Sequence, residues 1–172
     1  MFVITHALAP VVVANALSAL QLTRASTSRA FCNAHLIMIG IAGAAPDLLS
    51  PHWKLSARLQ SPTHTVWFLL AIYPVCLLVG RWLGQSRPWL IAHCMWLAVL
   101  LHLVCDAFAG GIAWLYPLNQ EILGGQYVPL PLWFLSDVLC VAAAYVLQHW
   151  VGALEMKRDG ELLMERHGGK VV

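Results

Sequence analysis

The sequence predicts an all-α membrane protein, a polytopic bundle of about five transmembrane helices. Of its 172 residues, 60% are hydrophobic and only 10% are charged, whereas water-soluble domains carry roughly 25% charged residues. The mean hydropathy is +0.72, and the apolar segments approach the roughly 20 residues with which a helix crosses a bilayer. A formal net charge of +2 without a basic stripe argues against a nucleic-acid partner. Membrane lipids are the expected surroundings.

Five apolar segments separated by polar links are the predicted helices. They cover residues 2–22, 31–49, 61–83, 89–116 and 132–154. The first is apolar over almost its whole length. The second carries Gly40, Gly43 and Ala44, small residues that let membrane helices pack closely. The third begins with Ser61-Pro62, a Ser cap followed by Pro at the first helical position.

The fourth and fifth segments differ in length and in their polar residues. The fourth is long enough to tilt, or to break near Gly110-Gly111. In the fifth, Asp137 lies near the start, where it is either a helix cap or a functional residue. Polar residues of mixed charge come after the fifth segment. We therefore predict a transmembrane bundle over residues 1–154 and a polar cytoplasmic tail over residues 155–172.

The distribution of Lys and Arg predicts the orientation in the membrane. With five spans, the first link, the third link and the tail share one side. Most basic residues lie there: Arg24, Arg29, Arg81, Arg87, Lys157, Arg158, Arg166 and Lys170. The opposite side has only Lys54 and Arg58. Because basic residues concentrate on the cytoplasmic side, we predict an outside N-terminus and a cytoplasmic C-terminus.

An imidazole and a carboxylate, His102 and Asp106, lie four residues apart inside the fourth apolar segment. On a helix this spacing places both on one face. An ionisable pair in a membrane segment is a candidate functional site, because unpaired polar groups are costly in hydrocarbon. In the predicted topology His6, Asp47 and His64 lie toward the same outer side. We expect these five side chains to approach one another.

Imidazoles and carboxylates from several helices form a mixed nitrogen and oxygen site, which suits zinc or another first-row divalent ion such as manganese. The predicted metal ligands are His6, Asp47, His64, His102 and Asp106. A bound ion would activate a water molecule, and Asp47 or Asp106 would be the catalytic base. Lys54 and Arg58, in the adjoining loop, are expected to bind an anionic substrate group.

Four short motifs resemble those of the YdjM-type metal-dependent hydrolases of bacterial inner membranes. They are Thr5-His6, Pro46-Asp47, Thr63-His64-Thr65 and HLVCDAFAGGIAWLYP at 102–117, and they occur in the family's order. Two positions depart from the family pattern. Leu49 stands where the P-D-x-D motif has its second acid, and Thr65 replaces the Ser of T-H-S while keeping a hydroxyl.

The resemblance implies a multi-pass protein of the bacterial inner membrane with metal-dependent hydrolase activity. The family is distantly similar to zinc-dependent phospholipases C. That similarity implies cleavage of a phosphoester in a lipid or lipid-linked substrate, at the depth of the lipid headgroups.

Two other function classes could use the same cluster. A proton or metal-ion transporter or channel predicts polar residues that continue toward the cytoplasmic side. The inner halves of the first and third segments have few, and His35 and His93 are the main candidates for such a path. A non-catalytic membrane scaffold would use the buried polar pairs to set helix register, and predicts that no metal binds.

Overall fold

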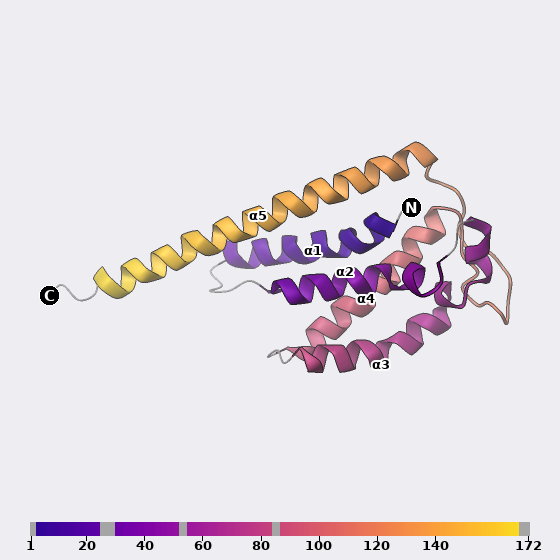
Figure 1. Cartoon of the computed structure of the whole chain (residues 1–172), viewed down its shortest axis with the longest axis horizontal. Coiled ribbons are helices and arrows are strands. Elements are labelled where there is room, and N and C mark those ends of the chain that lie inside the picture. Colours follow the sequence, from indigo (N-terminus) through magenta and orange to yellow (C-terminus); the bar gives the residue numbers. More distant parts are fainter. Residues whose placement is uncertain (1–2, 25–29, 52–54, 84–86, 169–172) are drawn as a thin grey trace.

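The computed structural model describes residues 3–24, 30–51, 55–83 and 87–168. Within these residues the chain forms five α-helices and two short 3-10 helices (Figure 1). Their bounds are α1 Val3–Thr23, α2 Asn33–Leu49, η1 Leu55–Gln60, η2 Pro62–His64, α3 Val66–Trp82, α4 Pro88–Phe108 and α5 Leu130–Gly168. The predicted all-α helix bundle is confirmed.

The helices pack in the spatial order α5, α1, α2, α4 and α3, and α4 also touches α1 (Figure 1). The core lies mainly between α2 and α4, where Ile39, Ile91, Val99 and Leu103 are almost fully buried. Burial of such side chains is the main source of stability outside the membrane, whereas within lipid close van der Waals packing takes over.

Three helices, α1, α4 and α5, are long and apolar enough to cross a membrane. The other two, α2 and α3, have 17 residues each, the lower end of the roughly 17–25 residues seen in spanning helices. The five-span topology therefore stays a prediction.

The small residues of α2 form the contact with α1. A Cβ added at Gly43 would overlap the carbonyl oxygen of His6, and one added at Gly40 would lie 3.3 Å from the carbonyl oxygen of Ala7. Only glycine allows the two backbones to approach this closely. The contact brings the start of α1 against the last turns of α2, where Asp47 lies.

Helix boundaries differ from the prediction in the third and fourth segments. Ser61-Pro62 begins η2 and not the long helix, whose cap is Thr65, with a hydroxyl that accepts from the Phe68 N–H at 3.3 Å. The fourth helix ends at Phe108, close to the predicted break near Gly110-Gly111, and does not continue to Tyr116. The chain turns at Gly111, which has a φ of 82°.

The loop after α4 is held by paired backbone hydrogen bonds. Ile112 and Leu123 exchange N–H···O bonds of 3.0 and 2.9 Å. A folded loop satisfies its backbone groups and closes over the end of the bundle, which a continued helix could not do.

The fifth helix continues well beyond Leu154, through the residues predicted as a polar tail. Its 39 residues span about 58 Å at about 1.5 Å per residue, roughly twice the hydrocarbon thickness of a bilayer. Its last turns project past the other helices (Figure 1). The residues after Leu154 are polar and of mixed charge, and they continue the same helix. The change in composition after Leu154 therefore does not mark the end of the helix.

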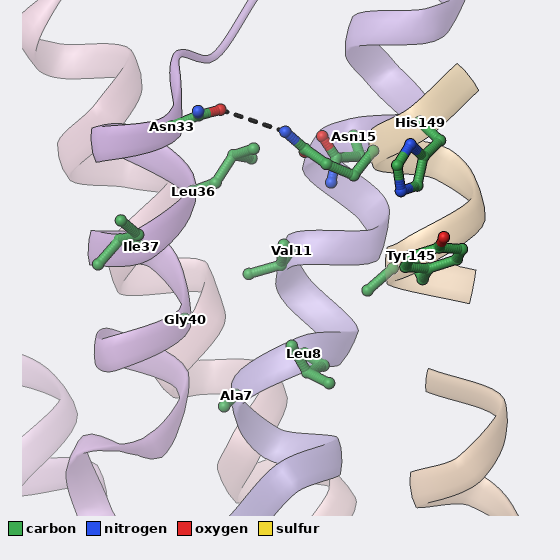
Figure 2. A pocket seen from close by; sticks show the side chains of 12 residues that line it. Ala7, Leu8, Val11, Asn15, Asn33, Leu36, Ile37, Gly40, Tyr145 and His149 are labelled. Carbon is green, nitrogen blue, oxygen red and sulfur yellow. Dashed lines mark hydrogen bonds between the residues drawn. The ribbon is translucent and has the colours of Figure 1, made fainter. Parts of the chain in front are cut away.

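A groove of about 520 Å³ runs along α1 between α2 and α5 (Figure 2). At one end Gln148 of α5 donates to Asn33 of α2 at 3.2 Å. Ala7 lies at the other end. The cluster of His and Asp side chains does not line this groove.

Candidate metal centre

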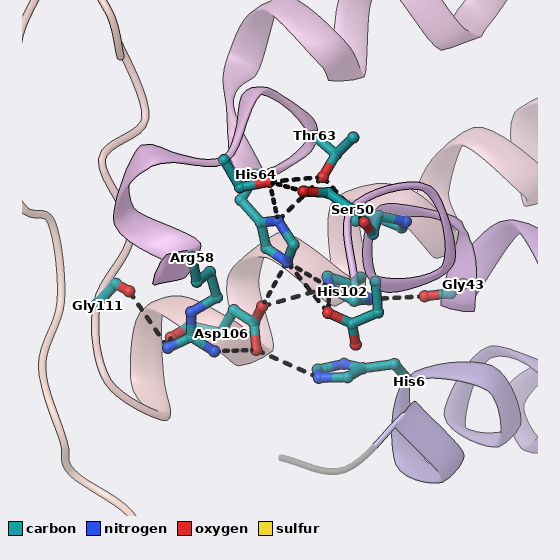
Figure 3. Close-up of polar contacts among 12 residues, drawn as sticks. His6, Gly43, Ser50, Arg58, Thr63, His64, His102, Asp106 and Gly111 are labelled. Carbon is teal, nitrogen blue, oxygen red and sulfur yellow. Dashed lines mark hydrogen bonds and ion pairs between the residues drawn. The ribbon is translucent and has the colours of Figure 1, made fainter. Parts of the chain in front are cut away.

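One end of the bundle gathers the five predicted ligand residues (Figure 3). His6 comes from the first turns of α1, Asp47 from the end of α2, and His64 from η2. His102 and Asp106 come from the last two turns of α4, on one face, with His102 Nε2 3.3 Å from Asp106 Oδ2. The antiparallel arrangement of α1 and α2 and the fold of the η1–η2 connection bring these residues together.

Three donor atoms in this cluster already have the spacing of a tetrahedral metal site, and a fourth lies beside them. His64 Nε2, His102 Nε2 and Asp106 Oδ2 are mutually 3.3 Å apart. Asp47 Oδ1 lies 3.3 Å from His64 Nε2 and 3.8 Å from His102 Nε2. Four ligands at about 2.0–2.2 Å from a tetrahedral zinc ion would themselves be about 3.3–3.6 Å apart. The residues therefore fit one divalent ion.

Hydrogen bonds on the far side of each imidazole direct its Nε2 toward the other donor atoms of the cluster. His102 Nδ1 lies 2.7 Å from the carbonyl oxygen of Gly43, which can only accept, so Nδ1 carries the proton. Thr63 donates its single hydroxyl hydrogen to the Pro46 carbonyl at 2.9 Å, and therefore accepts from His64 Nδ1 at 3.2 Å. Such partners fix the tautomer and ring orientation of metal-binding histidines.

Asp106 Oδ2 is a buried atom that meets only imidazole Nε2 atoms among the described residues, and these donate to it only when they carry a proton. Its side chain is 2% exposed, and its nearest neighbours are the Nε2 atoms of His64 and His102. A buried carboxylate oxygen without a partner is destabilising, and a cation would satisfy it. The Asp47 side chain, at 15% exposed, is the most accessible of the four.

His64 lies outside the long helices, and its charge state responds to the two carboxylates. Burial lowers the pKa of its imidazole, but hydrogen bonds to Asp106 and Asp47 raise the pKa by more, so it lies above the ordinary value. In the metal-free protein, a proton on the His64 imidazole supplies positive charge that a metal ion would otherwise supply. Protons and a metal ion therefore compete for this side chain.

The chain matches the family model for the YdjM inner membrane protein over residues 1–164. It belongs to this family. The match extends across all five helices and confirms the resemblance seen in the motifs. No curated protein and no solved structure matched the chain. The family and the apolar helices together place the protein in an inner membrane.

Leu49, at the position of the second acid in the family's motif, is 63% exposed. Its side chain therefore lies outside the buried cluster of this YdjM family member. The four donor atoms come from other positions, so the departure from P-D-x-D does not remove a member of the four-atom group.

Arg58, predicted as a substrate-binding residue in the adjoining loop, lies inside the cluster. It comes from η1, is 3% exposed, and places Nη1 2.6 Å from Asp106 Oδ1. Its Nη2 donates to the carbonyl oxygens of Asp106 and Gly111, both at 3.3 Å (Figure 3). The other residue of that prediction, Lys54, lies outside the described residues. Nothing in the sequence indicated that this basic residue of a short loop would point into the bundle.

His6 and Asp137 complete the surroundings of the cluster. His6 Nε2 lies 3.2 Å from Asp106 Oδ1, and its ring centroid is 4.0 Å from that of His102. His6 is thus next to the four-atom group and is not one of its members. Asp137 Oδ1 accepts from the backbone N–H of Thr5 at 3.0 Å and also contacts the Thr5 hydroxyl. Asp137 therefore caps α1, and does so from α5.

Proposed function

We propose that this protein is a membrane-bound, metal-dependent hydrolase that cleaves a phosphoester of a lipid or lipid-linked substrate. The observation that carries the proposal is a group of four donor atoms from Asp47, His64, His102 and Asp106, in which the three buried atoms of His64, His102 and Asp106 are mutually 3.3 Å apart. Zinc is the ion that suits two imidazoles and two carboxylates best, and manganese is a second choice.

Three of the donor atoms are well placed to hold the ion. His64, His102 and Asp106 are mutually equidistant, buried, and oriented by further hydrogen bonds. Catalytic zinc sites keep three protein ligands and an open position for water or substrate. His64, His102 and Asp106 would hold a divalent ion here, and the ion would supply Lewis acidity and lower the pKa of water at the open position.

Asp47 is the carboxylate best suited to act as general base. It is more exposed than Asp106, and its contact with His102, at 3.8 Å, is longer than the 3.3 Å contacts among His64, His102 and Asp106. Asp106 is engaged on both oxygens, by the imidazoles and by Arg58. In the proposed reaction the oxygen of water would bond to phosphorus as the ester P–O bond breaks. Asp47 would accept the proton of the water and pass it to the leaving alkoxide, while Asp106 would stay in place as a ligand.

The position of the cluster supports a substrate at headgroup depth. His6 lies in the first turns of α1 and Asp106 in the last turn of α4, and both helices are long enough to span a membrane. The ends of spanning helices lie near the polar headgroups. In the proposed orientation, with the N-terminus outside and the C-terminus in the cytoplasm, the site faces the outer leaflet.

A transporter would need polar side chains to continue from the cluster toward the other end of the bundle. Below His102, the buried positions of α4 are all apolar: Val99, Ala98, Met95, Ala92 and Ile91. His35 and Asn15 are buried at the far end, but apolar side chains of the core lie between them and the cluster. This arrangement favours the hydrolase over a proton or ion path.

Metal content tests the proposal first. We expect wild-type protein, purified in detergent, to bind zinc, and His64→Ala and His102→Ala to lose it while staying monodisperse and helical. His93→Ala is the matched control, since His93 also lies on α4 but its ring contacts Tyr73 and the Trp89 carbonyl, away from the cluster. Zinc-loaded protein should then release a phosphorylated headgroup from phospholipid vesicles. If the wild-type protein binds neither zinc nor manganese, the proposal is contradicted.

A further inference from the structure

The two oxygens of Asp106 face two different environments. Oδ2 belongs to the four-atom group, at 3.3 Å from both His64 Nε2 and His102 Nε2. Oδ1 faces away from that group, at 2.6 Å from Arg58 Nη1 and 3.2 Å from His6 Nε2 (Figure 3). A carboxylate whose oxygens are divided in this way is the usual bridge between two ions in a two-metal site, where the ions lie about 3.5–4 Å apart.

We propose that Arg58 is a built-in second cation, which restricts this centre to one metal ion. The inference rests on the proposed metal site but not on the hydrolase reaction. Without Arg58, Asp106 Oδ1 and His6 Nε2 would form an oxygen and nitrogen pair open to a second ion. With Arg58 present, the guanidinium holds the oxygen that this ion would need.

Arg58 is anchored, so a competing ion cannot displace it easily. Its side chain is 3% exposed, and Nη2 binds the carbonyl oxygens of Asp106 and Gly111 at the end of α4. The Asp106 carbonyl, in the last turn of α4, carries the partial negative charge of a helix C-terminus. Gly111 presents its carbonyl from a backbone with a φ of 82°, a conformation that glycine adopts readily. The loop after α4 thus forms part of the Arg58 site.

The charge of Arg58 is permanent, because a guanidinium is not deprotonated in proteins. The two carboxylates, Asp47 and Asp106, contribute a formal charge of −2. One divalent ion and Arg58 add +3, which leaves the centre at +1; a second divalent ion would raise it to +3. A buried excess of three charges is strongly unfavourable, whereas a charge of +1 attracts an anionic phosphoester through space without direct contact from Arg58.

Metal stoichiometry tests this inference directly. Wild type, Arg58→Lys, Arg58→Gln and the double variant Arg58→Gln with His6→Ala would be equilibrated with excess zinc, desalted, and measured for zinc per chain. We expect one zinc in wild type and in Arg58→Lys, which keeps the charge. Arg58→Gln should rise toward two, about a twofold increase, and the double variant should return to one because it lacks the second nitrogen ligand.

X-ray absorption spectroscopy on zinc-loaded wild type tests the same inference without any variant, so its outcome does not depend on how the variants fold. We expect no zinc–zinc scattering at the separation of a two-metal site. Two zinc ions per wild-type chain, or such scattering, overturns the inference, and so does folded Arg58→Gln that binds a single zinc. One zinc without any phosphoester cleavage refutes the hydrolase and leaves the role of Arg58 standing. A wild type that binds no metal overturns both.

Discussion

The Nδ1–H of His102 donates to the carbonyl oxygen of Gly43 across the interface of α4 and α2, at 2.7 Å. The same glycine permits the contact between α2 and α1, because a Cβ there would overlap the His6 carbonyl oxygen. One residue therefore sets both the helix spacing and the orientation of a metal-binding imidazole. Packing and chemistry are coupled at this point.

Gly43→Ala should weaken both stability and metal binding. The added methyl group pushes α1 away from α2 and moves the carbonyl that orients His102. Overpacking of this kind lowers the free energy of unfolding by about 1–3 kcal/mol. Thermal unfolding and zinc titration measure the two effects. Gly152→Ala is the matched control on α5, where an added Cβ meets nothing within 4 Å. Equal behaviour of the two variants would contradict the coupling.

Asp47→Asn should separate metal binding from catalysis. Because His64, His102 and Asp106 can hold the ion, we expect zinc content to stay near the wild-type value, with reduced affinity. Loss of a general base should lower kcat by about 10²–10⁴-fold. Asp106→Asn, in contrast, should lose zinc. If Asp47→Asn kept full activity on a phospholipid, the general base would have to be a different group.

Zinc affinity should fall as the pH falls. The pKa of His64 is raised in the metal-free protein, so its protonated form persists to a higher pH than that of a free imidazole. Only the deprotonated ring binds metal, so affinity increases as pH rises through the raised pKa and then levels off. Isothermal titration with zinc between about pH 5.5 and 8.5, a range around the ordinary His pKa of about 6.5, measures this.

The Asp47→Asn variant provides the control for that pH dependence. Because the Asp47 carboxylate helps to raise the pKa of His64, its removal should shift the inflection to lower pH. An affinity that does not change with pH, or that increases in acid, would exclude His64 as a ligand.

Asp137→Ala should destabilise the start of α1 without changing the number of ions bound. It removes the acceptor for the Thr5 N–H, and loss of a helix cap costs about 0.5–2 kcal/mol. Thermal unfolding measures the change. Asp159→Ala, an exposed position on the same helix, should be close to neutral. A loss of zinc at unchanged stability would instead make Asp137 a ligand.

A reporter fused after Val172 should be active only in the cytoplasm. This expectation rests on the basic residues in the first link, the third link and the tail, because basic residues concentrate on the cytoplasmic side. Paired reporters, one active in the cytoplasm and one outside it, give opposite signals at the same fusion point. A signal from outside would place the metal centre at the inner leaflet.

The sequence by itself determined the properties that depend on local spacing and composition. The length of the apolar segments indicated a helical membrane bundle, and the four-residue spacing of His102 and Asp106 put them on one helix face. Small residues in α2 indicated its close contact with α1. The motifs around His6, Asp47 and His64 indicated the family and the members of the cluster, and the family is confirmed.

Only the tertiary structure decided how the two oxygens of Asp106 are shared, that Arg58 is buried beside it, and that Asp137 caps α1. These contacts join residues 48 and 132 positions apart. Composition and periodicity report the surroundings of a residue within a few turns, whereas such pairs depend on how η1 and the loop after α4 fold over the bundle. The sequence left open whether the fourth segment tilts or breaks near Gly110-Gly111. The structure decided for the break, because the loop's own hydrogen bonds replace those of a continued helix.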